Sequence, residues 1–350
     1  MEVERKEWIL EEYVHGGVPT SRHLKLRTTS VGVSEDDVPD GHVLLRLHWL
    51  SVDPYLRARM GSQRDGLYFS PFELHKPVTT FGIGEVLQTK DSSFSVGEIV
   101  LNTIAPVSEY CTVPADALKK IKLGPDSGVS ALDYLGALGI PGFAAWIGIK
   151  VIGDPKPGEN VFISAAAGGV GLVAGQLAKL KGCRVVGSVG SDAKAKFLKE
   201  EIGYDDAFNY NVETDFDAAL SKYFPDGIDI YFDNVGGRML EAVINHLNTH
   251  ARIPLCGMIS QYNQVWTERF GVRNLLNLVG KEARMEGFLL DWNRFGEFVE
   301  ETTGYIKQRK IVSKYEIYRG TESFLESIQS MFTSSNGGKV IIQVNDDAKA

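Results

Sequence analysis

The residues best suited to chemistry in this 350-residue chain form a glycine-rich loop, Ala-Ala-Gly-Gly-Val-Gly, at residues 166–171. The loop follows an apolar, strand-like run and opens a helix-like run. On the G-x-G-x-x-G fingerprint, Ala166 takes the first position, Gly168 the second and Gly171 the third. These positions serve a tight turn, close approach to a pyrophosphate, and helix–strand packing. The loop therefore predicts a dinucleotide site at a helix N-terminus, with a purely structural tight turn as the alternative.

The end of the next predicted strand bears on which dinucleotide binds. NAD sites place an acidic residue there to bind the ribose 2′-hydroxyl. Here the strand CRVVGSVGS ends in small residues that include Gly187 and Ser188, and Asp192 is expected to be the N-cap of the following helix. Lys194 follows, and a cation beside small residues suits a 2′-phosphate. The pattern favours NADP(H), although Lys194 alone would also fit a solvated helix lysine.

Composition limits the other functions to consider. The chain is 43% hydrophobic and 23% charged with a net charge of −8, so it is globular and lacks the basic surplus of a nucleic-acid binder. Three widely spaced cysteines make neither a zinc knuckle nor a disulfide framework and favour a reducing compartment. The first residues lack an apolar signal segment, so a cytoplasmic location is expected. The uncharged stretch between Glu159 and Lys179 is interpreted as a buried strand–turn–helix, not a membrane span.

The predicted elements change character along the chain. The first third alternates short apolar runs with turn signals, as in GHVLLRLHWLSVDP and TTFGIGEVLQTK, which indicates an antiparallel barrel. From about residue 130, short strands alternate with helical patterns, as in a parallel sheet with crossover helices. After about residue 311 a strand, a helix and a last strand, KVIIQV, close the chain. The pattern alone leaves open whether this tail continues the parallel sheet or returns to the first domain.

Several longer motifs carry a family resemblance. The glycine loop with GALGIPGFAAW upstream resembles the medium-chain dehydrogenase/reductase superfamily. Within it, DPYLRARM, FNY, YFDNVGG and CGMISQYN resemble the zinc-independent alkenal/one oxidoreductases, which include prostaglandin and leukotriene reductases and plant NADPH-dependent double-bond reductases. The resemblance implies an α/β fold in which a Rossmann-type parallel-sheet domain, residues 132–311, is inserted in a GroES-like β-barrel domain, residues 1–131 and 312–350. It also implies a homodimer with its active site between the domains.

The resemblance also implies roles for individual residues. Positions of the pyrophosphate segment are matched by Ala166, Ala167, Gly168, Gly169 and Val170. Positions around the adenosine 2′-phosphate are matched by Gly187, Ser188, Lys194 and Tyr210. Segments lining the nicotinamide end are matched by Asn234, Cys256, Ser260, Tyr262, Phe288, Leu289 and Leu290. A cofactor-contacting asparagine is matched by Asn336.

Substrate contacts are implied for Tyr55 and Tyr262, and Phe81 stands where related plant enzymes often have tyrosine. The nearby aromatics Tyr68, Phe69 and Phe72 are weaker candidates for the pocket, because most aromatic residues of an enzyme lie in its core.

No metal is expected. The four-cysteine lobe of zinc-dependent relatives is missing, and His246 and His250, four residues apart, are a common spacing that we interpret as surface or packing residues. Without a metal, polarisation of the substrate must come from hydrogen bonds. The expected reaction is NADPH-dependent reduction of the C=C bond of enals and enones, with hydride added to the β-carbon and Tyr262 donating to the carbonyl oxygen. Quinone reduction, carbonyl reduction to an alcohol, or a non-catalytic NADPH-binding role are the alternatives.

Overall fold

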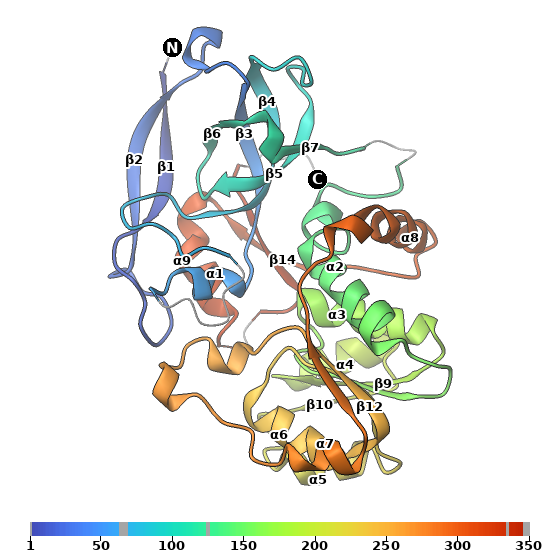
Figure 1. Cartoon of the computed structure of the whole chain (residues 1–350). Coiled ribbons are helices and arrows are strands. Elements are labelled where there is room, and N and C mark those ends of the chain that lie inside the picture. The colour runs from blue at the N-terminus through green and yellow to red at the C-terminus, as the bar shows by residue number, and fades with distance from the viewer. Residues whose placement is uncertain (1, 63–68, 124–126, 334–335, 346–350) are drawn as a thin grey trace. The chain divides into compact units, whose positions relative to one another are not determined.

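The computed structural model describes residues 2–62, 69–123, 127–333 and 336–345. Tyr68, one of the candidate pocket aromatics, lies outside these residues. The chain divides into two compact units (Figure 1). The first comprises the described residues up to Leu135, Tyr315–Thr333 and those from Val340 onward. The second comprises Gly136–Lys314 and the described residues that end at Lys339.

The first unit is built on an antiparallel sheet with the strand order β14-β15-β3-β4-β5-β7, and β6 also pairs with β3. The last strand, β15, pairs with β3, so the C-terminal tail is part of the first unit. β3 reads HVLLRLHWLS and is buried on both faces, which makes it the centre of the sheet. The strands are β1 (Glu2–Leu10), β2 (Leu24–Gly32), β3 (His42–Ser51), β4 (Thr79–Thr89), β5 (Ile99–Pro106), β6 (Tyr110–Pro114), β7 (Leu118–Lys120), β14 (Tyr315–Arg319) and β15 (Lys339–Gln343), with helices α1 (Tyr55–Arg59) and α9 (Phe324–Ser330).

The second unit is a parallel sheet in the order β10-β9-β8-β11-β12-β13, covered by helices. This is the doubly wound order in which the chain reverses direction between β8 and β11, the place where such sheets bind ligands at their carboxyl ends. The strands are β8 (Asn160–Ile163), β9 (Arg184–Val189), β10 (Asp206–Asn209), β11 (Ile228–Phe232), β12 (Leu247–Leu255) and β13 (Arg284–Gly287). The prediction of an α/β fold with a parallel-sheet domain is confirmed.

Alternating residues of the central strands build two separate cores. Val161 and Ile163 of β8 face the core shared with α2, α3 and α8, whereas Phe162 faces the core shared with α5 and α6. Strands buried on both faces are typical of parallel sheets with helices on either side. The helices are α2 (Ile140–Trp146), α3 (Gly169–Leu180), α4 (Asp192–Phe197), α5 (Phe216–Tyr223), α6 (Gly237–Asn245), α7 (Leu276–Gly280) and α8 (Phe295–Lys307), with π-helical turns at Ile147–Gly153 and Leu198–Ile202.

One local prediction was wrong, and the two histidines four residues apart lie in different elements. The N-cap of α4 is Ser191, not Asp192: Ser191 is extended and its side chain accepts a hydrogen bond from the Lys194 amide, while Asp192 is the first helical residue. His246 and His250 do not share a helix, because His246 caps the end of α6 and His250 lies in β12 with φ of +65°. Among the described residues, no helix is both long enough and apolar enough to cross a bilayer.

Candidate functional site

The glycine-rich loop forms the sharp turn between β8 and α3. Ala165 adopts a left-handed conformation with φ of +49°, and the Gly168 amide donates to the Ala165 carbonyl at 3.0 Å. A Cβ on Gly171 would lie 2.5 Å from the Ala165 oxygen, so only glycine lets the helix pack on this turn. A Cβ on Gly168 would meet a single atom, at 3.3 Å, which leaves the backbone there approachable from outside. The first turn of the twelve-residue helix α3 thus presents its amides beside an open loop.

The carboxyl end of β9 lies directly against this loop. The Ala166 amide donates to the Ser188 carbonyl at 3.0 Å, and a Cβ on Gly187 would lie 2.6 Å from the Ala166 Cβ. Gly187 is therefore explained by close packing of the loop on the strand. The Ser188 side chain is almost fully buried, and its hydroxyl has no hydrogen-bond partner in the described part of the protein. Since buried polar atoms are nearly always paired, Ser188 is a candidate to bind a group from outside the chain.

Among the described residues, those that directly follow β9 offer no unpaired carboxylate of the kind that binds the ribose 2′-hydroxyl of NAD. Asp192 is the first acidic side chain after the strand, and its Oδ1 accepts a hydrogen bond from Asn209 Nδ2 at 3.0 Å. Lys194 is half-buried on α4, and the Tyr210 amide donates to the Val189 carbonyl at 3.0 Å, which places Tyr210 at the same edge of the sheet. The open glycine loop, the unpartnered Ser188 hydroxyl and the nearby Lys194 fit a dinucleotide that carries a 2′-phosphate.

Two turns at the carboxyl ends of β11 and β12 bring together four of the predicted site residues: Asn234, Cys256, Ser260 and Tyr262. The Ile259 amide donates to the Asn234 carbonyl at 3.0 Å. The Ser260 amide and hydroxyl both donate to the Val235 carbonyl, at 3.2 and 2.6 Å. The segment 256–262, here called the tyrosine loop, is therefore fastened along the turn 233–236.

Glycines make room for this contact. Gly236 and Gly237 have φ of +66° and +60°, which L side chains rarely adopt. A Cβ on Gly236 would lie 2.8 Å from Met258 Cγ, and one on Gly237 would lie 2.7 Å from Gln261 Nε2. The two glycines of the DNVGG motif are therefore required by the approach of the tyrosine loop.

Tyr262 has its hydroxyl held at a defined position. The Met258 amide donates to Tyr262 Oη at 3.2 Å, and a Cβ on Gly257 would lie 2.9 Å from that oxygen. Burial raises the pKa of Tyr262 to about 12, although the Met258 amide opposes the shift. The phenol is therefore protonated at neutral pH, and since its oxygen already accepts a hydrogen bond, its proton is the part left to donate. Burial likewise raises the pKa of Cys256 to about 12, so its thiol is not a nucleophile at neutral pH.

Sequence reasoning missed the buried residues beneath this arrangement. Asp233, fully buried at the end of β11, accepts hydrogen bonds through Oδ1 from Tyr231 Oη at 2.7 Å and from the Val235 and Gly236 amides, both at 2.8 Å. The Ser164 hydroxyl accepts from the Asn234 amide at 3.0 Å. The only signal in the sequence was the YFDNVGG motif, in which Asn234 alone was selected.

The segment 336–339 lies beside the glycine loop. The Gly338 amide donates to the Ala167 carbonyl at 3.0 Å, and Gly168 and Gly338 form a parallel bridge. Asn336 Nδ2 makes a long contact, 3.5 Å, with the Gly338 carbonyl. Asn336 is thus two residues from Gly338, which contacts the glycine loop. The segment 336–339 and the loop lie side by side although they are far apart in sequence.

Residues 288–290, which follow β13, were predicted to line the nicotinamide end of the site, and their side chains lie in different surroundings. A Cβ on Gly148 would lie 3.1 Å from Phe288 Cζ, so this ring packs into the core against the π-helical turn. Leu290 also packs on this core, whereas Leu289 is 62% exposed.

The remaining predicted residues belong to the first unit. The Tyr55 ring lies 4.9 Å from that of Phe69, and the Arg59 guanidinium lies 3.9 Å from the Phe72 ring centre. Phe81 packs on the cluster around Trp49 and Ile83.

Comparison with known proteins identifies the family. Residues 6–121 match the family described as the N-terminal domain of oxidoreductase, and residues 169–303 match the zinc-binding dehydrogenase family. The chain is 40% identical to a 2-alkenal reductase (NADP(+)-dependent) of Nicotiana tabacum, covering 98% of both chains. It is 40% identical to (+)-pulegone reductase of Mentha piperita, covering 98% of this chain and 99% of that protein. The chain belongs to the medium-chain dehydrogenase/reductase family. A crystal structure of CurA in complex with NADPH, from Vibrio vulnificus, matches with a TM-score of 0.88 and 34% identity over 97% of this chain and 99% of that one.

Membership of this dehydrogenase/reductase family raises the question of metal ligands, because one matching family is described as zinc-binding. Across the described ranges, no group of three or more histidine, cysteine or acidic side chains is arranged to hold an ion. Cys111 is buried, and its sulfur lies 3.6 Å from Asn102 Nδ2. Independence from zinc stays a prediction.

Proposed function

We propose that this chain uses NADPH to reduce the C=C bond of α,β-unsaturated aldehydes and ketones. The similarity to the tobacco 2-alkenal reductase and to pulegone reductase supports this class of reaction. The observation that carries the proposal is the hydrogen bonding of Tyr262: its oxygen accepts the Met258 amide, and its O–H donates to no residue that the structure describes, so it can donate to a bound ligand. A conjugated carbonyl oxygen is an acceptor of the required kind.

Tyr262 acts on the charge that develops during the reaction. NADPH, when bound, supplies a hydride to the β-carbon of the substrate. The carbonyl oxygen then gains the negative charge of an enolate, and the Tyr262 hydroxyl donates its hydrogen bond to that oxygen. A proton, from water or from Tyr262, then adds to the α-carbon and gives the saturated product. Such a donor stabilises the transition state more than the ground state. The Met258 amide polarises the phenol and strengthens it as a donor, while burial keeps the proton on the oxygen at neutral pH.

Other residues hold the cofactor in this proposal. The amides of the first turn of α3 and the glycine loop, Ala166–Val170, would bind the pyrophosphate. The 2′-phosphate would be bound around Gly187, Ser188, Lys194 and Tyr210. The nicotinamide end would be lined by Asn234, Cys256, Ser260, Tyr262 and residues 288–290, and Asn336 would also contact the cofactor. Tyr55 and Phe81 would contact the substrate.

Product analysis tests the function directly. The purified protein is incubated with NADPH or NADH and either a phenylpropenal or a benzalacetone-type enone, with and without a chelator. We expect a saturated aldehyde or ketone, formed with NADPH and unaffected by the chelator. An allylic alcohol would show that the carbonyl carbon takes the hydride, contradicting the mechanism. Turnover of quinones alone, or NADPH binding without turnover, would favour the alternative functions.

We also propose that the protein is a cytoplasmic homodimer. The short edge strand β13 and the preceding helix α7 expose apolar side chains: Leu276 is 79% and Val279 73% exposed. Arg284 and Glu286 of β13 lie 3.3 Å apart as an ion pair within the chain. In an antiparallel pair of β13 strands, Arg284 of one copy would also face Glu286 of the other. Light scattering should give a dimer for the wild type and a monomer for Leu276→Glu; a wild-type monomer would contradict the proposal.

The proposed cytoplasmic location agrees with the three cysteines, which are all free, as expected in a reducing compartment. Microscopy of a fluorescent fusion protein tests this location.

A further inference from the structure

Asp233 lies beneath the tyrosine loop and, in the described part of the chain, has one side-chain oxygen that is paired and one that is not. Its side chain is fully buried, yet Oδ2 has no hydrogen-bond partner among the described residues, while Oδ1 accepts three short hydrogen bonds and a longer one, 3.4 Å, from Ser164 Oγ. Burial raises the pKa of this carboxyl, because the charged form loses its hydration. The charged form of a carboxyl in such a place costs stability to the extent that its hydrogen bonds do not replace the lost hydration.

The contacts of Asp233 lead to the tyrosine loop by two routes. Through its backbone, the Asp233 carbonyl accepts the Cys256 and Gly257 amides at 2.9 and 3.1 Å. Through its side chain, Oδ1 binds the Val235 and Gly236 amides and so fixes the turn 233–236. The Asn234 and Val235 carbonyls of this turn accept hydrogen bonds from the Ile259 and Ser260 amides of the tyrosine loop.

We propose that Asp233 is a positioning residue for the reduction, whose buried carboxylate fixes the turn 233–236 and thereby holds the Tyr262 hydroxyl where the substrate carbonyl binds. The inference rests on the proposed function, since it assigns the effect of Asp233 on turnover to Tyr262. Asp233 itself touches neither substrate nor cofactor in this scheme.

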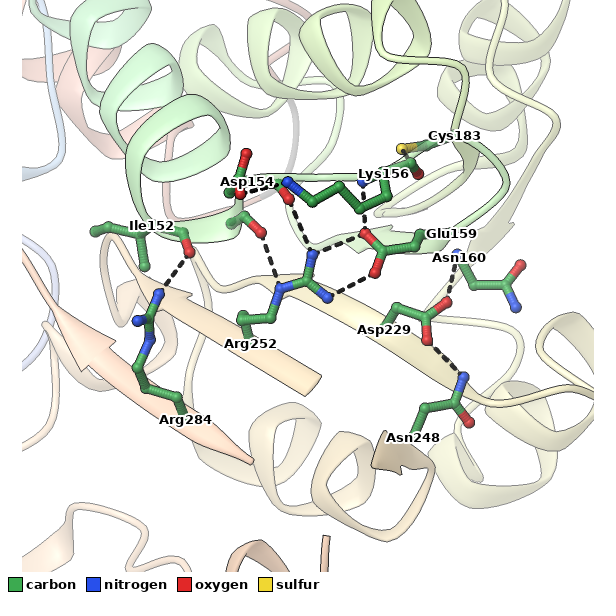
Figure 2. Close-up of polar contacts among 11 residues, drawn as sticks. Ile152, Asp154, Lys156, Glu159, Asn160, Cys183, Asp229, Asn248, Arg252 and Arg284 are labelled. Atoms are coloured by element: carbon green, nitrogen blue, oxygen red, sulfur yellow. Dashed lines mark hydrogen bonds and ion pairs between the residues drawn. The ribbon is translucent and has the colours of Figure 1, made fainter. Parts of the chain in front are cut away.

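The matched control is Asp229, at the other end of the same strand. Its Oδ2 accepts the Asn160 amide and its Oδ1 accepts Asn248 Nδ2, both at 2.8 Å (Figure 2). Asp229→Asn and Asp233→Asn therefore make the same chemical change on β11, one away from the tyrosine loop and one beneath it.

A double-mutant cycle with Tyr262→Phe is the first test. Asp233→Asn should lower kcat for a benzalacetone-type enone about tenfold, as expected for a weakened hydrogen bond to a charged group, with the Kd of NADPH changed less than about threefold. In the Tyr262→Phe background the same substitution should change kcat less than about twofold, because the two residues act as one unit. Equal losses of kcat in both backgrounds, or an unchanged kcat in Asp233→Asn, would overturn the proposal. So would a Tyr262→Phe variant with wild-type turnover, even though the wild type still formed the saturated product.

Hydrogen exchange supplies a readout that needs no turnover. The amides of residues 256–260 should exchange about tenfold faster in Asp233→Asn than in the wild type, while Asp229→Asn should leave them unchanged. Unchanged exchange in Asp233→Asn would overturn the positioning role. If the wild type reduces no enone but exchange responds as expected, the proposed reaction is wrong and Asp233 still orders the loop. Tyr231→Phe, which removes one donor to Oδ1 and keeps the ring packed on Phe162, should shift both readouts in the same direction by less, and it serves if Asp233→Asn does not fold.

Discussion

The polar groups at the two ends of the parallel sheet differ in how completely they are hydrogen-bonded within the chain. At the amino end, the Arg252 guanidinium donates to both oxygens of Glu159, at 2.8 and 2.7 Å, to the Gly153 carbonyl at 2.9 Å and to the Asp154 carbonyl at 3.2 Å (Figure 2). The Lys156 amide also donates to Glu159, at 2.7 Å. Charge and hydrogen bonds are satisfied within the chain, as expected of a cluster that serves stability.

At the carboxyl end, buried polar atoms stay without partners. In the part of the chain that the structure describes, neither Ser188 Oγ nor Asp233 Oδ2 has a hydrogen bond, and Tyr262 keeps a proton to donate. Ligands of doubly wound sheets bind at this end. The two clusters therefore differ in whether their buried polar atoms are all paired within the chain. Substitutions at the two ends should therefore change different measured quantities.

The largest effect is expected for Tyr262→Phe. Removal of one donor to a developing oxyanion should lower kcat about 10²- to 10³-fold. The Kd of NADPH, measured by fluorescence titration, should change less than about threefold, because the hydroxyl acts on the substrate. Tyr305→Phe is the control: burial raises the pKa of Tyr305 to about 12 as well, but its hydroxyl already donates to Glu301 at 2.8 Å. If both variants keep wild-type turnover, the assignment of Tyr262 is wrong.

At the amino end, Arg252→Met should lower stability and leave catalysis intact. The substitution leaves the partly buried Glu159 carboxylate without its ion-pair partner. Loss of one partner of such a pair lowers the free energy of unfolding by about 3 kcal/mol. The measurement is urea unfolding followed by circular dichroism, with kcat determined well below the melting temperature. The double variant with Glu159→Gln should be less destabilised than the sum of the single variants. A large loss of kcat in folded Arg252→Met would remove the distinction between the two ends.

Lys194→Ala should have a more selective effect. A charge-assisted hydrogen bond to the 2′-phosphate accounts for about a tenfold or greater loss of affinity when it is removed, so the Kd of NADPH should rise by that factor while the Kd of NADH stays constant. Lys196→Ala is the control from the same helix, since Lys196 is exposed and lies 3.8 Å from Glu200. Equal changes for NADPH and NADH would argue against a 2′-phosphate contact.

Sequence patterns were enough for the fold class because strand and helix periods are local properties. The alternation after residue 130 predicted β8, β9, β11, β12 and β13 but not the four-residue strand β10, and β8, the loop and α3 occur in the expected order. The N-cap of α4 was misassigned by one residue because Ser191 and Asp192 are both good caps and only the backbone conformation selects between them.

The site was harder to predict because its buried part depends on contacts between strands. Asp233 takes its role from the Ser164 and Tyr231 hydroxyls, and Ser164 directly follows another strand, β8, 67 residues before Tyr231. No local pattern marks such a network. The roles of the site residues remain predictions, and the structure adds how the tyrosine loop is held.

The smallest effect, the pH dependence of stability, should have opposite signs at the two ends. Burial raises the pKa of Glu159, but the hydrogen bonds from Arg252 and the Lys156 amide outweigh it, and the pKa is below its usual value. Its contribution to stability is therefore present above the unfolded-state pKa, about 4.3, and is lost as the pH falls through the lower folded-state pKa. The wild type should lose its advantage over Glu159→Gln in urea unfolding between pH 6 and pH 3.

Asp233 should behave in the reverse way, because burial raises its pKa and the charged form is disfavoured in the folded state. The cost of that charge appears as the pH rises from the unfolded-state pKa, about 3.9, through the folded-state pKa. Relative to Asp233→Asn, the wild type should therefore gain stability as the pH falls from 7 to 4. Parallel pH slopes for the two comparisons would show that both carboxylates are simply stabilising, and the contrast between the two ends of the sheet would then hold for hydrogen bonds but not for charge.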